Sequence, residues 1–240
     1  MRSKLKKDEL TRVFFHDIKN KLLTLKFNLY IIQNKPVDEE KKKEILEKLL
    51  ITTEQTIDMV QDLLDSQKYT ETKFLRYHTF PLEHLIREII EELELDAQRK
   101  KVKVLFVCPH EHLMIKANRE WLKKALFNIL HNSIKYNKYE GRVAINIHQE
   151  KDGYLLVIKD TGVGISQEEK EKIFKKYYSS DKKNGSGIGL NMAKTFIEQH
   201  GGLILFESEK NRGSVFYIYL PKNMQISKFK QFFLRLFNRI

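Results

Sequence analysis

The stretch Asp160-Thr161-Gly162-Val163-Gly164-Ile165 decides the fold, and it follows directly on the apolar run at residues 154–159. The run predicts a buried strand, and the glycines after it predict a tight loop. A carboxylate at the end of a strand can accept a hydrogen bond from an exocyclic amine. Glycine lets the backbone approach a flat base closely. Taken alone, the same six residues fit a simple turn equally well, so their meaning depends on the rest of the chain.

A second polar stretch precedes this loop, on a predicted helix that Asn118 caps and that runs to about Tyr136. Asn128, Asn132 and Lys135 are spaced at i, i+4 and i+7, so they project from one side of the helix. A carboxamide oxygen can ligate Mg²⁺, and a lysine can meet phosphate oxygens. The three side chains therefore either hold a metal-bound nucleotide or form an ordinary polar helix face.

The third stretch is Gly185-Ser186-Gly187-Ile188-Gly189-Leu190, which opens a predicted helix over residues 188–199. Alternate glycines leave backbone N–H groups bare beside a helix N-terminus, and such groups bind anions. The stretch is not a Rossmann fingerprint, because no strand precedes it. It is not a Walker loop either, because no Gly-Lys-Ser/Thr follows. A flexible linker is the alternative interpretation.

The N-terminal part has a purely helical pattern. Apolar residues at helical spacing predict one helix over residues 5–34 and a second over 39–69, joined by a turn that contains Pro36. Two long helices with a short connection form an antiparallel hairpin. A lone hairpin cannot bury apolar faces this broad, so we expect a homodimer in which two hairpins form a four-helix bundle.

Helices and strands alternate after about residue 74, which predicts an α/β sandwich with a mixed sheet. Helices are expected over residues 82–99, 118–136, 167–174 and 188–199, and strands over residues 77–80, 102–107, 113–116, 143–148, 154–159, 203–207 and 215–220. The pattern ends in a basic segment with phenylalanine, leucine and isoleucine on one helical face. We therefore expect three parts, residues 1–72, 73–221 and 222–240.

Composition favours a cytoplasmic protein. The chain of 240 residues has a single cysteine, no signal peptide, and no stretch near the roughly 18 apolar residues of a membrane span. The net charge of +12 is interspersed, except that residues 221–240 carry basic and no acidic groups. This distribution argues against nucleic-acid binding. The basic tail, at residues 226–240, suits peripheral contact with the inner membrane face, docking of a partner, or packing on the protein's own surface.

In this order and spacing, the three stretches resemble the ATP-binding domain of the superfamily of histidine kinases, Hsp90, gyrase and MutL (the GHKL or Bergerat fold). Residues 128–136 resemble its N box, 160–165 its G1 box, 173–174 its F box and 185–190 its G2 box. The resemblance implies ATP and Mg²⁺ as cofactors.

The same resemblance implies a role for each box. Asn132 would ligate Mg²⁺, Asn128 and Lys135 would lie near the phosphates, and Asp160 would accept a hydrogen bond from the adenine amine. The glycines of the third stretch would form the hinge and cradle of an ATP lid. The nucleotide-site residues expected on this basis are Asn128, Asn132, Lys135, Tyr136, Asp160, Gly162, Gly164, Gly185, Gly187, Gly189 and Leu190.

The first predicted helix carries a further motif, His-Asp-Ile-Lys-Asn at residues 16–20. His16 lies two residues from both Phe14 and Ile18, so it points away from the apolar stripe and toward solvent. On a dimerising hairpin ahead of this ATP domain, the motif resembles the H box of a sensor histidine kinase.

The H-box resemblance implies that His16 is phosphorylated, that Asp17 supports its tautomer, and that Asn20 orients a water for dephosphorylation of a regulator. The family commonly has Pro after the Thr or Asn of the box, whereas Lys21 stands here. We therefore expect that the usual bend of this helix is absent.

The implied function is an ATP-dependent protein histidine kinase that autophosphorylates and passes the phosphoryl group to an Asp of a response regulator receiver domain, with phosphatase activity as a second expectation. Almost nothing precedes the hairpin, so we expect a separate sensory partner. One alternative is a phosphotransferase or phosphatase that uses ATP poorly, which the intact glycine stretches disfavour. Another is a superfamily ATPase or anti-sigma Ser/Thr kinase acting as a binding module, which the His-Asp pair at residues 16–17 disfavours.

Overall fold

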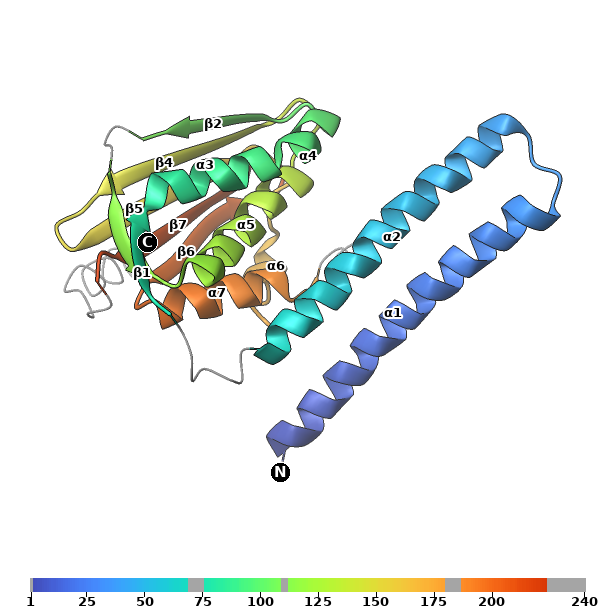
Figure 1. The fold of residues 1–240 in the computed structure, drawn as a ribbon, viewed down its shortest axis with the longest axis horizontal. Coiled ribbons are helices and arrows are strands. Elements are labelled where there is room, and N and C mark those ends of the chain that lie inside the picture. Colours follow the sequence, from blue (N-terminus) through green and yellow to red (C-terminus); the bar gives the residue numbers. More distant parts are fainter. Residues whose placement is uncertain (1, 69–75, 109–111, 180–186, 224–240) are drawn as a thin grey trace. The chain divides into compact units, whose positions relative to one another are not determined.

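The computed structural model describes residues 2–68, 76–108, 112–179 and 187–223, and Figure 1 follows them in chain order. The chain divides into two compact units. The first comprises residues 1–72 and 175–188, and the second comprises residues 73–174 and 189–240.

The first unit is built on two long helices, α1 (Arg2–Asn34) and α2 (Glu39–Lys68), which run side by side in Figure 1. Pro36 lies in the short connection between them, where it ends the first helix. The Asp38 side chain accepts a hydrogen bond of 2.7 Å from the backbone N–H of Lys41 and so caps α2. The predicted helical hairpin is confirmed.

The hairpin buries only part of its apolar surface within one chain. On α2, Ile45 and Met59 are buried, whereas the neighbouring stripe is exposed, with Leu46 and Ile57 at 50% and 61%. Leu22 of α1 is exposed as well. Exposed leucines and isoleucines in a continuous helical face are the feature that a four-helix bundle would cover.

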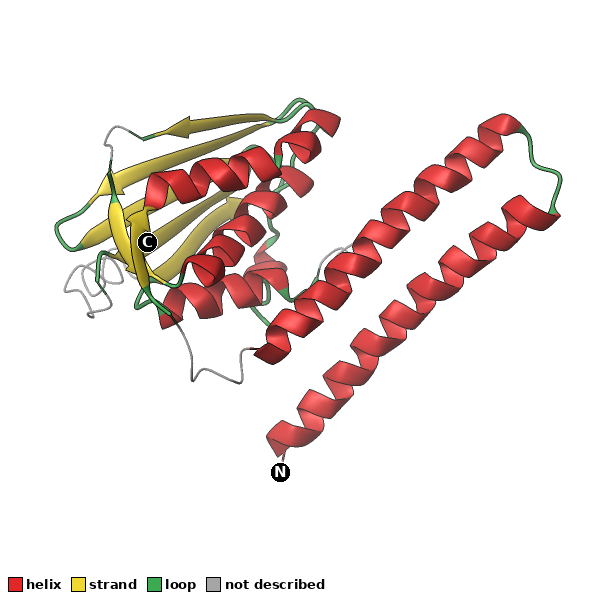
Figure 2. Cartoon of the chain, in the orientation of Figure 1, coloured by secondary structure: helices red, strands yellow, loops and turns green. Residues whose placement is uncertain are grey.

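The second unit is a five-stranded mixed sheet with a separate strand pair (Figures 1 and 2). The strand order is β2 (Lys103–Val107), β4 (Arg142–Gln149), β5 (Gly153–Asp160), β7 (Gly213–Pro221) and β6 (Leu203–Glu209). Only the first of these pairs is parallel. The separate antiparallel pair is β1 (His78–Pro81) with β3 (Met114–Ala117).

Helices cover one face of the five-stranded sheet. They are α3 (Leu82–Glu92), α4 (Glu94–Arg99), α5 (Arg119–Lys135) and α7 (Gly189–Gln199), with a short α6 (Gln167–Lys170) beside them. Alternate residues of the strands, such as Ile145, Ile158 and Ile218, are fully buried on this face. Leu126 and Ile129 of α5 are fully buried as well. The predicted α/β sandwich is confirmed.

Two predicted helices differ from the observed ones. The helix expected over residues 82–99 is interrupted at Leu93, whose φ and ψ of −93° and 3° leave the helical region. This turn keeps both Leu93 and Ala97 buried in the core. The helix expected over residues 167–174 ends at Lys170. Its start is fixed by a capping box between Ser166 and Glu169, and a tighter turn then follows.

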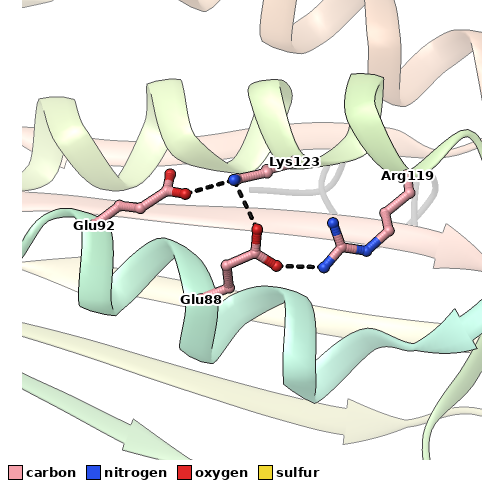
Figure 3. Close-up of polar contacts among 4 residues, drawn as sticks. All are labelled: Glu88, Glu92, Arg119 and Lys123. Atoms are coloured by element: carbon pink, nitrogen blue, oxygen red, sulfur yellow. Dashed lines mark hydrogen bonds and ion pairs between the residues drawn. The ribbon is translucent and has the colours of Figure 1, made fainter.

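Four charged side chains join α3 to α5 (Figure 3). Lys123 donates hydrogen bonds to Glu88 at 2.7 Å and to Glu92 at 2.5 Å, and Arg119 binds the second oxygen of Glu88. The hydrogen bonds from Lys123 and Arg119 lower the pKa of Glu88. Because the four groups are only partly exposed, this network holds α3 against α5 more firmly than isolated surface pairs would.

We expect Lys123→Gln to lower the free energy of unfolding by about 1 kcal/mol at low salt, because two carboxylates then lose their shared partner. The loss should shrink at about 1 M salt, where ion pairs are screened. Urea unfolding at both salt concentrations measures it. Lys116→Gln is the control, since the side chain of Lys116 is exposed. If the free energy of unfolding fell equally at both salt concentrations, Lys123 would stabilise the protein through packing and not through its charge.

Candidate functional site

The carboxylate of Asp160 is the centre of the candidate site. It lies at the end of β5 and is only 6% exposed. Its Oδ1 atom accepts hydrogen bonds from the backbone N–H groups of Gly162 at 2.8 Å and Ser214 at 3.1 Å. Burial raises the pKa of Asp160, and the two N–H bonds oppose that rise. The side chain is thus held in one orientation by the backbone around it.

The loop after Asp160 is pressed against the end of α5. The N–H of Val163 donates to the carbonyl oxygen of Tyr136 at 3.0 Å. A Cβ atom on Gly162 would lie 2.5 Å from that same oxygen, so this position has no room for a side chain. Gly164 has a φ of +65°, a conformation that favours glycine. Both glycines predicted for the site are therefore required by the local backbone.

The turn between β6 and β7 holds the other side of this loop. Asn211 donates its N–H to the carbonyl oxygen of Val163 at 2.7 Å, and Ile165 donates its N–H to the Ser208 hydroxyl at 2.8 Å. The hydroxyl of Ser208 in turn donates to the carbonyl oxygen of Gly213 at 2.8 Å. Sequence reasoning missed Ser208 and Ser214, which face each other across the strands. Two serines near the turn between two predicted strands were the available signal.

Asn137 links α5 to the sheet and was also missed. It is buried, and its side-chain nitrogen donates to the carbonyl oxygens of Ser133 and Arg142, each at 3.0 Å. Its side-chain oxygen accepts a hydrogen bond of 3.1 Å from the hydroxyl of Thr161. The hydrogen bond from Thr161 therefore holds the Asn137 side chain, which in turn connects α5 to β4. An asparagine directly after a predicted helix was the only sequence signal.

The polar face of α5 meets the start of α7. The amide of Asn128 donates to the carbonyl oxygen of Gly189 at 3.2 Å, and a Cβ on Gly189 would lie 3.3 Å from the Asn128 side-chain oxygen. Asn132 and Lys135 follow on the same helix and are half-buried. The Lys135 ammonium lies 5.7 Å from the ring centroid of Tyr136. The structure thus places Asn128 beside the second glycine-rich stretch.

The structure also describes Gly187 and Leu190 of the glycine-rich stretch at residues 185–190. Leu190 is half-buried in the first turn of α7. Gly187 has a φ of +66°, and a Cβ there would lie 2.5 Å from the Tyr177 backbone. Gly185 lies outside the described residues.

A buried histidine joins the ends of α5 and α7. The Nε2 atom of His200 accepts the N–H of Asn118 at 3.0 Å, and its Nδ1 atom lies 2.7 Å from the carbonyl oxygen of Phe196. Burial lowers the pKa of His200, which keeps the ring neutral and Nε2 available as an acceptor. The Asn118 side chain also accepts the N–H of Trp121 at 3.0 Å, which confirms the predicted cap.

His16, in the first unit, presents its imidazole to solvent, with 69% of the side chain exposed. This confirms the predicted orientation. Its Nδ1 atom lies 3.6 Å from an Asp17 carboxylate oxygen and 3.2 Å from the side-chain nitrogen of Asn20, one turn further on. Both neighbours therefore approach the same ring nitrogen, and neither contact involves Nε2.

Helix α1 continues without interruption past His16, as expected from the absence of proline after Asn20. Lys21, which stands at that position, donates a hydrogen bond of 2.6 Å to the Gln55 side chain on α2. A contact across the hairpin thus occurs at the place where the family commonly has Pro.

Comparison with known proteins agrees with this geometry. Residues 117–224, which include both polar stretches and the start of α7, match the family described as histidine kinase-, DNA gyrase B- and HSP90-like ATPase. The heme sensor protein HssS of Staphylococcus saprophyticus is 30% identical over 86% of this chain and 45% of its own length. The adaptive-response sensory kinase SasA of Gloeothece citriformis is 27% identical over 90% of this chain and 58% of its own length.

The chain is similar to sensor histidine kinases. The catalytic domain of histidine kinase ThkA shares 28% identity with it and covers 63% of this chain and 99% of that domain, with a TM-score of 0.58. A longer ThkA structure, solved in complex with the response regulator protein TrrA, has the same fold over 93% of this chain and 64% of its own, at 24% identity and a TM-score of 0.75.

The second unit accordingly resembles the ATP-binding domains of this family. The chain spans between 25% and 59% of the length of curated relatives that it matches. Among the residues that the structure describes, none of the helices is both long and apolar enough to cross a membrane.

We expect Asp160→Asn to stabilise the protein at neutral pH. Because burial raises the pKa of Asp160 above its ordinary value of 3.8, the folded state binds a proton more readily than the unfolded state. The ionised wild type therefore loses stability as pH rises through the folded-state pKa, and the variant does not. Thermal unfolding across the pH range should show a gain that grows from pH 3.8 upward and then levels off.

The control for this experiment is Glu168→Gln, which neutralises an exposed carboxyl group of the same unit. A loss of stability on Asp160→Asn at neutral pH would contradict the expectation. It would mean that the bonds from Gly162 and Ser214 favour the ionised carboxylate by more than burial disfavours it.

Proposed function

We propose that this chain is an ATP-dependent protein histidine kinase that phosphorylates its own His16. The observation that carries the proposal is the exposed imidazole of His16, flanked by Asp17 and Asn20, in a chain that also contains a histidine kinase-type ATP-binding domain. An ATPase of the same superfamily needs no such histidine on a separate helical hairpin.

The adenine would be read by Asp160. Its Oδ1 atom is already engaged by Gly162 and Ser214, and no hydrogen bond to Oδ2 occurs among the described residues. Oδ2 is therefore the atom that would accept the exocyclic amine. Gly162 and Gly164 let the loop beside it pass close to the backbone of Tyr136 and Glu209, where a side chain would not fit.

The phosphates would lie along the polar face of α5, near Asn128, Lys135 and Tyr136, and beside the glycines at the start of α7. Asn132 offers one carboxamide oxygen, which suits Mg²⁺ because that ion commonly takes one or two protein ligands and completes its shell with phosphate oxygens and water. Bound Mg²⁺ would neutralise charge on the phosphates. The described residues contain no cluster of three or more His, Cys, Asp or Glu that could hold a metal alone.

His16 would act as the nucleophile through Nε2. Asp17, close to Nδ1, favours the tautomer with a proton on Nδ1 and leaves the lone pair of Nε2 free. In that tautomer the amide of Asn20 turns its oxygen, in place of its nitrogen, toward Nδ1. A bond forms between Nε2 and the γ-phosphorus as the bond to the β–γ bridging oxygen breaks, and ADP leaves. Asn20 is placed to orient a water molecule when the regulator is dephosphorylated.

The phosphohistidine would then pass its phosphoryl group to an aspartate of a response regulator receiver domain. Residues 1–72 would form the dimerising and phosphotransfer part, residues 73–221 the catalytic part, and residues 222–240 a basic tail. The exposed apolar face of the hairpin supports a homodimer, since a second copy would bury it. We also propose a cytoplasmic location and input from a separate sensory partner.

The test is incubation of the purified chain with Mg²⁺ and γ-labelled ATP. We expect acid-labile, alkali-stable label on the wild type and on the control His148→Gln, which changes an exposed histidine of β4. His16→Gln should reduce labelling to background while ATP binding is unchanged. Label that survives acid, or that persists in His16→Gln, would contradict the proposal. A wild type that binds ATP but takes no label would instead favour the phosphatase alternative.

A further inference from the structure

Two residues are buried on the face of the sheet that the helices do not cover. Side chains alternate along a strand, and Ile218 of β7 belongs to the helix-covered face. Tyr219 must therefore project from the opposite face, together with Leu203, its partner on β6. Yet Tyr219 is 0% exposed and Leu203 only 9%. Burial this complete on an outer sheet face requires a covering element.

These two residues form the centre of an apolar patch, which we call the Tyr219 patch. Leu155, Leu205 and Tyr217 pack against them and are partly buried. The patch therefore spans the three adjacent strands β5, β7 and β6. One margin of the patch is polar. There the Tyr217 hydroxyl donates a hydrogen bond of 3.3 Å to the exposed carboxylate of Glu207.

None of the described helices of the second unit accounts for this burial. Figure 2 shows α3, α5 and α7 together on the other face of the sheet. The inward residues Ile158, Phe216 and Ile218 lie on that face. The exposed fraction of Tyr219 is that of a single chain, so the cover of the Tyr219 patch must be a segment of this chain other than these helices.

The chain itself provides a suitable segment at the right place. Strand β7 ends at Pro221, two residues after Tyr219, and the description ends at Asn223. Residues 224–240 follow. A 17-residue helix is about 25 Å long, whereas two strand spacings from β5 to β6 span only about 10 Å. The segment is therefore long enough to cross the whole patch.

The sequence of this segment also matches the surface. On a helix, one face would carry Phe229, Phe232, Phe233, Leu236, Phe237 and Ile240, and the basic residues would lie elsewhere. Its attachment to the end of β7 gives it a high effective concentration at the patch, which a free partner lacks. We propose that residues 226–240 dock as an amphipathic helix on the Tyr219 patch of the same chain. This inference does not depend on kinase activity.

Photocrosslinking tests the proposal in the full chain. The photoreactive amino acid p-benzoylphenylalanine replaces Leu205 in one variant and Glu207, at the exposed margin of the patch, in a second. A third variant carries it at Leu95 of α4, an exposed position on the helix-covered side, as a control. Mass spectrometry of a mixture of unlabelled and ¹⁵N-labelled protein then identifies the crosslinked peptides and separates crosslinks within one chain from those between two.

We expect crosslinks from positions 205 and 207 to residues 226–240 of the same chain, and none from position 95. Phe233→Asp should remove most of the crosslink because it places a charge on the apolar face. Arg235→Asp, on the basic side, should retain it and serves as the matched control. Mixed-isotope crosslinks would mean that a second copy covers the patch and would overturn the proposal. So would the absence of tail crosslinks from both positions, including a result in which the tail binds anionic vesicles instead.

Discussion

The buried carboxylate of Asp160 is the constraint on which the second unit depends. A carboxylate removed from water is costly unless hydrogen bonds compensate for its lost hydration, and here Gly162 and Ser214 donate them. These bonds require the loop after β5 and the start of β7 to lie in contact. The carbonyl oxygen of Tyr136 then holds the same loop against α5. One charged group thereby fixes the relative positions of a helix, a loop and a hairpin.

The carboxylate proposed to recognise adenine and the imidazole proposed to accept the phosphoryl group have opposite environments, and each environment suits its proposed role. Asp160 is buried and held by backbone donors, as recognition of one specific amine requires, because an unmatched buried partner is costly. His16 is exposed on a long helix, and among the described residues its polar contacts are with its neighbours Asp17 and Asn20. A nucleophile that must meet first ATP and then a receiver domain has to be accessible. Under the proposed function, recognition and reactivity therefore belong to different units of the chain.

Features encoded locally could be predicted from the sequence. The hairpin, the cap at Asn118, the mixed sheet and the exposure of His16 follow from periodicity and from capping chemistry. Features that depend on long-range packing could not. The turn at Leu93 arises because both halves of that helix must bury apolar residues. Asn137 and Ser208 acquire their roles only when distant segments meet, so the weak local signals at these positions did not identify those roles.

Nucleotide binding with a changed base edge tests the recognition step most directly. ADP and IDP differ at position 6 of the base, where IDP has a carbonyl oxygen in place of the amine, and at N1, which carries a hydrogen only in IDP. Oδ2 of Asp160 would accept a hydrogen bond from the amine but would face the carbonyl oxygen as a second acceptor. Calorimetry with the full chain should show IDP binding on the order of 100-fold more weakly than ADP. Equal affinities would contradict the assignment of Asp160 as the adenine-reading residue.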